Sequence, residues 1–449
     1  MAALGIVAAL VLALAPPAGL APAAALAGAV TLVALTFWAT GVIPDKLTSA
    51  GYLLAAMTLS LAPPGVVLSG FASSAFWLIF GGLVLGAAVH RSGLAARLAQ
   101  AIAHRLGGSY LGLSSGIVCA GLVLAFLIPS STGRVVLLIP IVLALADGFG
   151  LAPGSRGRSG LVLAMVFATT LPGFAILPAS VPTAILIGGS EPQYGIVPSY
   201  GQYLLLHFPV LGLLKCTVIV VLTQLMFAEA PRRDSGDTEP SPLSAAEWRT
   251  GIIVLAALAL WLSDRWHGLS PAWISMAAAA ACLAPPGSLI GPPQLRHDIN
   301  YGVLLLLAGL LGAANVVAYS GLGDYLGRLL LEALALQPGD DARSFFSLVG
   351  VSGLVALIGT LPSVPAVMTA LAGDIAGATG LPVETVLMMQ VPAYSTPLLP
   401  YQVVPVLIAA RLGSVSIGTA TRFCLLLGAI TVALLIPLDY LWWRFLGVL

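Results

Sequence analysis

The chain has 449 residues, of which 59% are hydrophobic and only 8% are charged, with a formal net charge of +1. Soluble globular domains have about 25% charged residues, so this composition excludes that class and indicates a polytopic membrane protein. The near-zero net charge gives no sign of a nucleic-acid partner. The four cysteines lie far apart in apolar runs, without the spacing of a metal site or a disulfide framework.

At about 20 apolar residues per crossing, the hydrophobic runs predict about eleven transmembrane helices in an all-α fold. The first run lacks the basic residues that begin a signal peptide, and a second run follows at once, so we interpret it as a short first span. The expected spans, hairpins excluded, are residues 3–14, 23–43, 47–61, 75–89, 160–196, 203–227, 251–263, 273–283, 301–317, 384–411 and 421–441.

The stretch FLIPSSTGRVVLLIPI, residues 126–141, has Pro129, Gly133 and Arg134 in the middle of an apolar run. A continuous membrane helix has no reason to place these residues together, whereas a broken helix does. Broken backbone at membrane depth is tolerated where it is buried in protein or lines a cavity, and such segments form the sites of secondary transporters. We therefore predict a re-entrant hairpin over residues 112–149 with its tip at 129–134.

Three further segments are interrupted in the same way. The long run 160–196 is broken by Pro172-Gly173 and by residues 178–183. In the second half, residues 344–378 form a second hairpin candidate with Pro362-Ser363-Val364-Pro365 at its centre, and the run 384–411 is broken by residues 395–402. We expect each hairpin to be followed by a broken span.

The two halves of the chain have the same order of parts. Ser92-Gly93-Leu94 and Ser320-Gly321-Leu322 each follow a span and open an amphipathic stretch, as expected for helices in the membrane interface. The predicted domains are N-terminal scaffold helices (1–70), a first repeat (71–228, with interfacial helix 90–106), a cytoplasmic linker (229–249) and a second repeat (250–449, with interfacial helix 319–336).

The distribution of basic residues predicts the orientation. Eleven spans counted from a cytoplasmic N-terminus put most Lys and Arg on the cytoplasmic side and leave outside only Arg265, Arg328, Arg343 and Arg444, as the positive-inside rule requires. The two interfacial helices then lie on opposite faces, which is typical of inverted-topology repeats. We expect an integral protein of a bacterial inner membrane, with the C-terminus outside.

These parts, and the PSSTGR of the first hairpin above all, resemble the divalent anion/sodium symporter family of sodium-coupled dicarboxylate and sulfate carriers. The resemblance implies a homodimer with a scaffold domain and a moving transport domain. In that family each hairpin tip has Ser-Asn-Thr, and the tips and span breaks hold sodium and the carboxylates of the substrate. This chain departs from that pattern, because its two asparagines, Asn300 and Asn315, lie at neither tip.

The resemblance and the oxygen chemistry of sodium, a hard cation, together give two sets of candidate residues. One sodium site is expected at the first tip, whereas the prolines and the valine of the second tip supply no side-chain oxygen. The alternative is that both tips are helix breaks packed in protein. The ion-binding candidates are Ser130, Ser131, Ser180, Thr183, Thr360 and Ser363; the substrate-binding candidates are Ser131, Thr132, Arg134, Ser363, Thr396, Tyr401 and Gln402.

Several charged residues admit two interpretations. An Arg134 buried in the membrane would bind a carboxylate of the anion, or pair structurally with hairpin carbonyls or with Asp147. Lys215 and His207, eight residues apart on one helix, would neutralise the charge of the substrate, or be a snorkelling lysine and a core histidine. Asp147 and Asp374 near the hairpin ends fit structural roles. No Asp or Glu stands at mid-span, which argues against carboxylate-based proton coupling.

The function that these patterns favour is secondary active transport of a small anion by alternating access, coupled to sodium. A sodium-independent anion exchanger and a proton-coupled carrier are the alternatives. The five histidines are scattered without a ligand pair, which disfavours a membrane enzyme, and a channel has no need of an occluding inverted repeat. We expect no catalytic residue and no cofactor apart from the coupling ion; the expected partners are a small anion, the lipid bilayer and a second copy of the chain.

Overall fold

The computed structural model describes residues 2–98, 101, 109–128, 130–230, 242–285, 288–334 and 336–449, which form helices and no strand. Nine helices in these residues are long and apolar enough to cross a membrane: Ser74–Arg91, Tyr110–Leu127, Ser131–Gly148, Arg156–Ala175, Tyr200–Phe227, Ala245–Leu262, Tyr301–Tyr319, Asp341–Ile358 and Ile417–Phe445. Shorter apolar helices cover Ala3–Leu14, Pro22–Trp38 and Pro271–Leu283. The all-α membrane fold is confirmed, while the number of crossings stays a prediction.

The first predicted hairpin is a pair of contacting helices, α8 (Tyr110–Leu127) and α9 (Ser131–Gly148). Pro129, at its tip, lies outside the described residues. The following span is broken as predicted: α10 (Arg156–Thr170) ends in two short 3-10 turns, η1 (Pro172–Ala175) and η2 (Leu177–Ala179), before α11 (Val181–Tyr194) begins.

The second half also has a pair of contacting helices followed by a broken span. Helices α20 (Asp341–Ile358) and α21 (Ser363–Thr379) contact each other where the second hairpin is predicted. The broken span that follows consists of α22 (Val383–Met388), α23 (Val391–Tyr394), the 3-10 turn η4 (Pro400–Gln402) and α24 (Val404–Leu412).

The hairpins and broken spans pack across the two halves. Helix α9 of the first hairpin contacts α10 of its own broken span and α24 of the other. Helix α21 of the second hairpin contacts α22 of its own broken span and α11 of the other. Each hairpin is thus held between the two broken spans, and the breaks come together in the interior.

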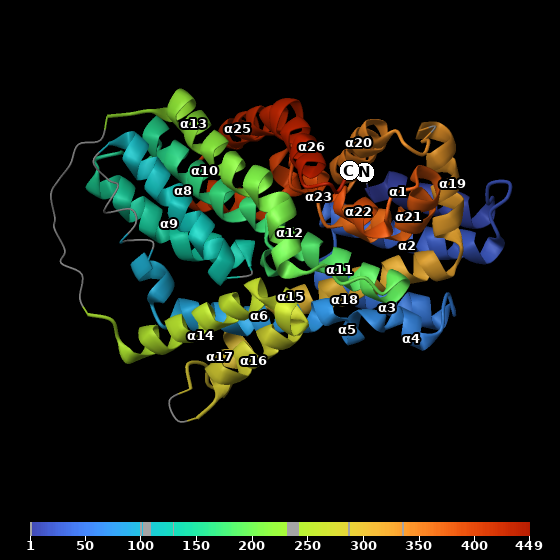
Figure 1. Cartoon of the computed structure of the whole chain (residues 1–449), viewed down its shortest axis with the longest axis horizontal. Helices are drawn as coiled ribbons and strands as arrows, with labels where there is room; N and C mark the ends of the chain where they lie inside the picture. The colour runs from blue at the N-terminus through green and yellow to red at the C-terminus, as the bar shows by residue number, and fades with distance from the viewer. Residues whose placement is uncertain are drawn as a thin grey trace.

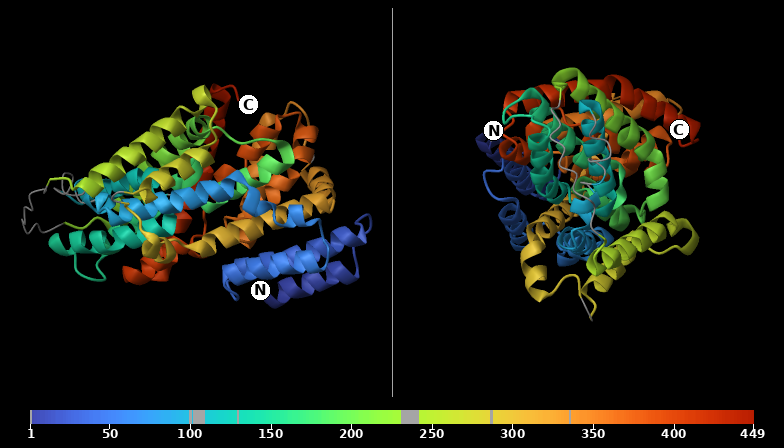
Figure 2. Two further views of the ribbon diagram at one scale, coloured as in Figure 1. Left: turned by 90° about the horizontal axis from the view of Figure 1, so that it is seen from below. Right: turned by 90° about the vertical axis from the view of Figure 1, so that its left-hand side faces the viewer.

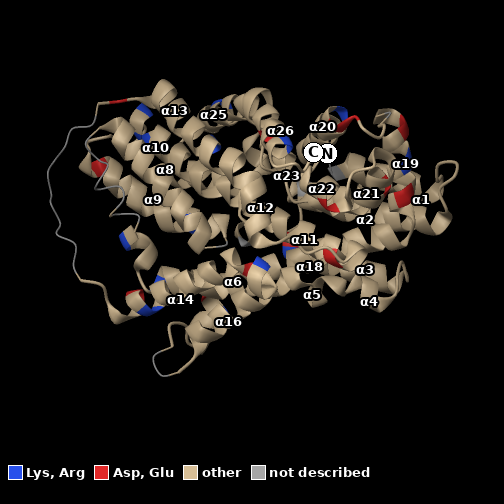
Figure 3. Cartoon of the chain, in the orientation of Figure 1, with Lys and Arg blue, Asp and Glu red and all other residues tan. Residues whose placement is uncertain are grey.

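The remaining helices surround this core. In Figure 1, α8, α9, α10 and α13 (Lys215–Phe227) lie at one end of the molecule, and α1 (Ala2–Leu14), α2 (Pro22–Thr40) and α19 (Leu322–Leu334) lie at the other. The termini lie on opposite sides (Figure 2). Charged residues gather at helix ends and connections, as Figure 3 shows.

The other helices are α3 (Asp45–Thr58), α4 (Pro64–Val67), α5 (Ser69–Ala72), α6 (Ser74–Arg91), α12 (Tyr200–His207), α14 (Ala245–Leu262), α15 (Asp264–His267), α16 (Pro271–Leu283), α17 (Pro292–Asp298), α18 (Tyr301–Tyr319), α25 (Ile417–Ile430) and α26 (Ile436–Phe445).

Two long spans differ from a regular helix. The segment Tyr200–Phe227 contains the π-helix η3 (Phe208–Leu214), and Ile417–Phe445 contains the π-helix η5 (Thr431–Leu435). Pro209 lies inside η3, and Pro437 follows η5. Proline lacks a backbone N–H and its ring crowds the preceding turn, so it favours a local departure from the α-helical hydrogen-bond pattern. Hydropathy gives no sign of either π-helix.

Two predicted boundaries shift. Helix α14 begins at Ala245, inside the predicted linker 229–249, because Ser244 and Glu247 form a capping box there; residues 231–241 lie outside the description. The predicted interfacial helix 90–106 lies partly outside the described residues, while its counterpart in the second half is the strongly amphipathic α19.

Helices α6 and α16 are in direct backbone contact at Gly81. A Cβ added there would lie 2.6 Å from the carbonyl carbon and oxygen of Ser275, whose hydroxyl donates to Leu78 O at 2.9 Å. We expect Gly81→Ala to lower the free energy of unfolding by about 1–3 kcal/mol, because the two helices must separate. The midpoint of thermal unfolding in detergent measures it. The matched control is Gly148→Ala, where no atom lies within 4 Å and little change is expected; equal effects of the two variants would contradict the prediction.

Candidate functional site

Arg134 joins the first hairpin to the first span break. Its side chain is fully buried, and its guanidinium donates to four oxygens. Nε donates to Thr169 O at 2.9 Å, Nη1 to Ile128 O, and Nη2 to Ser131 Oγ at 3.0 Å and to Ala179 O at 3.4 Å. The planar fork of arginine suits several acceptors held at fixed angles. The guanidinium therefore clamps the tip of the hairpin onto the break.

Arg134 has no carboxylate partner among the described residues. Asp147, the acid considered from the sequence, pairs with Arg158 instead. Gly173 leaves room for the guanidinium, because a Cβ there would lie 2.8 Å from Nη2. The predicted contact with carbonyls is thus observed, whereas the predicted contact with an anion stays a prediction. A buried positive charge offset only by backbone dipoles and a hydroxyl remains at the hairpin tip.

The hydroxyls of the first tip have separate local roles. Ser130 Oγ accepts from Gly133 N at 3.2 Å and caps the N-terminus of α9, as serine commonly does. Ser131 Oγ is the acceptor for Arg134. Thr132 is exposed. The tip thus presents the exposed Thr132 hydroxyl beside the start of a helix.

The two span breaks meet at a buried cluster of oxygens. Ser180 Oγ lies 2.7 Å from Thr183 Oγ1, which is 3.5 Å from both Phe174 O and the hydroxyl of Tyr203. The Tyr203 hydroxyl donates to Phe174 O at 2.7 Å and lies 3.1 Å from that of Tyr394, from the second broken span. All four side chains are buried. Sequence reasoning named Ser180 and Thr183 but missed both tyrosines, because a tyrosine in an apolar run looks like a core residue.

At the second tip, Ser363 and Thr360 pair with each other. Ser363 Oγ accepts from Thr360 N at 3.3 Å and lies 3.5 Å from Thr360 Oγ1. Thr396, in the second break, donates to Pro392 O at 2.6 Å, within its own turn. These three hydroxyls are satisfied locally, and within the described residues no hydrogen bond joins the Thr360–Ser363 pair to Thr396.

Gln402 and Tyr401 fasten the second break to the first arm of its hairpin. Gln402 Oε1 accepts from Leu398 N and Leu399 N, both at 2.8 Å, and Nε2 donates to Ala356 O at 2.7 Å. The hydroxyl of the partly exposed Tyr401 donates to Leu357 O. Backbone groups thus occupy Gln402 Oε1 twice and Nε2 once, and the role predicted for both residues in anion binding stays a prediction.

Lys215 reaches the second break from α13. Its side chain is fully buried, and Nζ donates to Ser395 O at 2.9 Å and to Ser395 Oγ at 3.3 Å. It therefore does not snorkel to a membrane surface. The structure places one buried cation at each break, Arg134 at the first and Lys215 at the second.

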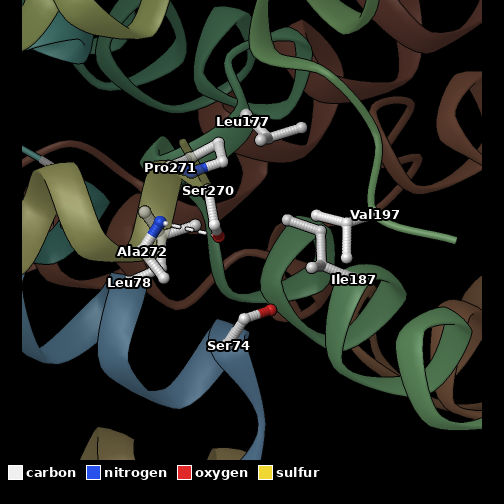
Figure 4. A pocket seen from close by; sticks show the side chains of 8 residues that line it. All are labelled: Ser74, Leu78, Leu177, Ile187, Val197, Ser270, Pro271 and Ala272. Carbon is white, nitrogen blue, oxygen red and sulfur yellow. Dashed lines mark hydrogen bonds between the residues drawn. The ribbon is translucent and has the colours of Figure 1, made fainter. Parts of the chain in front are cut away.

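A small hollow lies away from these residues. It is half open, lies between α6, α11 and α16 and is too narrow for a water molecule, with Ser74 and Ser270 as the polar side chains of a mostly apolar lining (Figure 4). It has no cation to attract an anion. Within the described residues, no group of three or more His, Cys, Asp or Glu could hold a metal ion.

Comparison with known proteins places the chain in a family. The model of the family described as "Sodium:sulfate symporter transmembrane region" matches residues 1–449. The sodium-dependent dicarboxylate transporter SdcS of Staphylococcus saprophyticus is 25% identical over 331 residues, 67% of this chain and 64% of the relative. The L-tartrate/succinate antiporter of Escherichia coli is 25% identical over 310 residues, 65% of this chain and 61% of the relative. The matched region is less than two thirds of the length of either relative.

The same fold occurs among solved structures. The YdaH transporter of Alcanivorax borkumensis superposes with a TM-score of 0.63 over 90% of this chain and 99% of that chain, at 16% sequence identity. Because identity is so low, this likeness concerns the fold alone. The family match over the whole chain confirms the resemblance inferred from the broken helices: the chain belongs to the sodium:sulfate symporter transmembrane family.

Proposed function

We propose that this protein is a secondary active transporter that moves a small anion across a bacterial plasma membrane by alternating access, with sodium as the coupling ion. The anion would be a di- or tricarboxylate or a sulfate-like ion. The family description names sulfate, and the names of the relatives specify dicarboxylate, tartrate and succinate.

The observation on which the proposal rests is the positive charge where the broken helices begin. Arg134 is fully buried without an acidic partner among the described residues. Helices α9 and α11 start beside it, at Ser131 and Val181, and α21 and α24 start at the corresponding points of the second half. Helix N-termini favour anions through their free N–H groups and the helix dipole. A small anion is the ligand that this arrangement attracts.

The proposed sodium site is at the first break. Ser180 Oγ, Thr183 Oγ1, Phe174 O and the hydroxyls of Tyr203 and Tyr394 form a buried cluster of oxygens of the kind that hard cations bind. The cluster joins the two broken spans, so ion binding there would draw the breaks together. Ser130, Ser131, Thr360 and Ser363 remain candidates beyond this cluster.

Alternating access would use the two halves as inverted repeats. The exchange of contacts, α9 with α24 and α21 with α11, supports a two-fold relation between hairpins that enter from opposite sides. We further propose a homodimer with cytoplasmic N-termini and external C-termini. Light scattering of the detergent complex and cysteine labelling of Arg343→Cys from outside would test these two points.

The function is tested by uptake of labelled succinate and sulfate into proteoliposomes, with and without an inward sodium gradient. We expect uptake of at least one of the two anions that rises with the gradient. Uptake of neither anion, with or without sodium and with or without internal anion, would contradict the proposal. Uptake that requires internal succinate but not sodium would select the exchanger, which the antiporter relative and the missing tip asparagines favour.

Removal of one hydroxyl group tests the proposed sodium site. We expect Thr183→Val, which keeps the shape but removes the oxygen, to raise the sodium concentration for half-maximal uptake about tenfold, equivalent to about 1.4 kcal/mol. The control is Thr217→Val at an exposed position of α13. An unchanged sodium dependence in Thr183→Val, with uptake preserved, would place the ion elsewhere.

A further inference from the structure

Three ionisable side chains are buried where the two π-helices of the structure meet. His207 precedes η3 and Lys215 follows it, whereas Asp439 lies in α26, just after η5. All three side chains are 0% exposed, and η3 contacts both η5 and α26. π-Helical turns are rare and frequently occur at functional sites. No acid was expected at mid-span, but Asp439 is fully buried within Ile417–Phe445.

Two of these side chains lack hydrogen-bond partners. Neither oxygen of Asp439 and neither ring nitrogen of His207 has a partner among the described residues. The His207 ring lies between the rings of Tyr203 and Trp443, with centroids 4.6 Å and 5.6 Å away. Buried polar atoms are almost always satisfied, so unsatisfied ones in a native fold call for a reason beyond folding. The carboxylate oxygens of Asp439 and the ring nitrogens of His207 are therefore free to take up and release a proton.

Lys215 connects this cluster to the second span break. Its ammonium group donates to both oxygens of Ser395, and Lys215 and Asp439 act on each other electrostatically. An ammonium has three donors and no acceptor, so two bonds to Ser395 leave one N–H free. The electrostatic interaction with Asp439 therefore acts on the same ammonium group that binds Ser395.

The ionisable groups around the cluster are few. From α13 the neighbour of Lys215 is Cys216, and from α12 the neighbour of His207 is Tyr203, whose hydroxyl contacts Tyr394 of α23. No Lys–Asp ion pair within 4.0 Å forms among these described groups, since Asp439 has no partner. Lys215 is therefore the positive group that balances the charge of Asp439, without an ion pair between them.

We propose that Asp439, Lys215 and His207 form a proton-binding site that sets the charge at the second span break. With Asp439 ionised and Lys215 protonated, the pair is neutral. A proton added to a carboxylate oxygen of Asp439 gives the pair a charge of one unit, so the ammonium is no longer offset and attracts an anion at the break. Loss of that proton on the other side of the membrane restores the neutral pair. His207 is the neighbouring acceptor through which the proton enters or leaves.

This inference deepens the proposed transport, on which its coupling step rests, by adding a proton at the second break to the sodium proposed at the first. The binding of the proton itself does not depend on transport. Two measurements, one without substrate and one with it, therefore separate the two ideas.

The first measurement is the tryptophan fluorescence of the solubilised full chain titrated with acid. A charge arising on His207 or a change on Asp439, one helical turn from Trp443, alters the fluorescence of that indole. We expect a titrating component that is lost in Trp443→Phe and shifted or lost in Asp439→Asn and in His207→Gln. The control Asp324→Asn, at an exposed position, should keep it. A pH profile shared by the parent protein and Trp443→Phe would overturn the proposal.

The second measurement is the internal pH of proteoliposomes loaded with a trapped pH dye, with succinate and sulfate as probes. Inward anion gradients should acidify the lumen in the parent protein and in Asp324→Asn. The variant Asp439→Asn, which cannot take up the proton but keeps Lys215 and its two bonds to Ser395, should lose the acidification but retain anion counterflow. Anion uptake without acidification in the parent protein, or acidification unchanged in Asp439→Asn, would overturn the proton site and leave the transport function intact.

Discussion

Arg134→Met is expected to lower the free energy of unfolding by about 3–5 kcal/mol, because buried backbone carbonyls lose the guanidinium that donates to them. The substitution leaves Thr169 O and Ala179 O without the donor that Arg134 supplies, whereas Ile128 O keeps the backbone N–H of Ser130 at 2.9 Å. Each unsatisfied buried group costs about 1–3 kcal/mol, so the sum reaches this range even after relaxation. The midpoint of thermal unfolding in detergent measures the loss.

Two further variants test the reason for this loss. Arg134→Lys keeps the charge but not the planar fork, so it should restore only part of the stability. Arg422→Met, at an exposed position of α25, is the control and should change the midpoint little. Full stability in Arg134→Lys would mean that the charge, and not the geometry of the clamp, stabilises the first break. Full stability in Arg134→Met, together with loss of uptake, would make Arg134 purely an anion ligand.

Gln402→Leu is expected to destabilise the protein by about 2–5 kcal/mol. The change removes two acceptor bonds, to Leu398 N and Leu399 N, and one donor bond, to Ala356 O, at a site where the side chain is 5% exposed. Each lost partner leaves a backbone group to be satisfied in another way, at about 1–3 kcal/mol when buried. Thermal unfolding in detergent, beside uptake of succinate, checks the prediction.

The nearly isosteric variant Gln402→Glu separates the two kinds of bond. A glutamate keeps the acceptor for both N–H groups, and in its protonated form its O–H donates to Ala356 O, so below neutral pH we expect a smaller loss than in Gln402→Leu. Gln202→Leu, at an exposed position of α12, serves as the control. Stable Gln402 variants with weaker anion affinity would restore the role in substrate binding that the sequence suggested.

The architecture of the site follows from local chemistry. Proline inside an apolar run removes a backbone N–H, and glycine weakens a helix through its conformational freedom, so the breaks at Pro172-Gly173 and at residues 395–402 could be located from the sequence. Ser130 and Ser180 were likewise recognisable as residues at the starts of half-helices, where each caps the backbone.

The contacts between side chains and residues of distant helices could not be predicted from the sequence. Arg134 was expected to bind an anion or to pair with a hairpin carbonyl or Asp147, yet half of its bonds go to carbonyls of a separate span, Thr169 and Ala179. Asp439 was missed because it stands near the end of an apolar run, where an acid looks like an interfacial residue. Its burial follows from the packing of α26 against η3 and α12.

The sequence by itself determined that the chain is a membrane protein, where its helices break, and which family it resembles, because hydropathy and the geometry of proline and glycine act over a few residues. Only the tertiary structure decided which oxygens surround Arg134, that Tyr203 and Tyr394 join the two breaks, and that Lys215 and Asp439 are buried near each other. These facts depend on contacts between residues up to about half the chain apart. Such contacts are selected by the packing of whole helices, which no local pattern specifies.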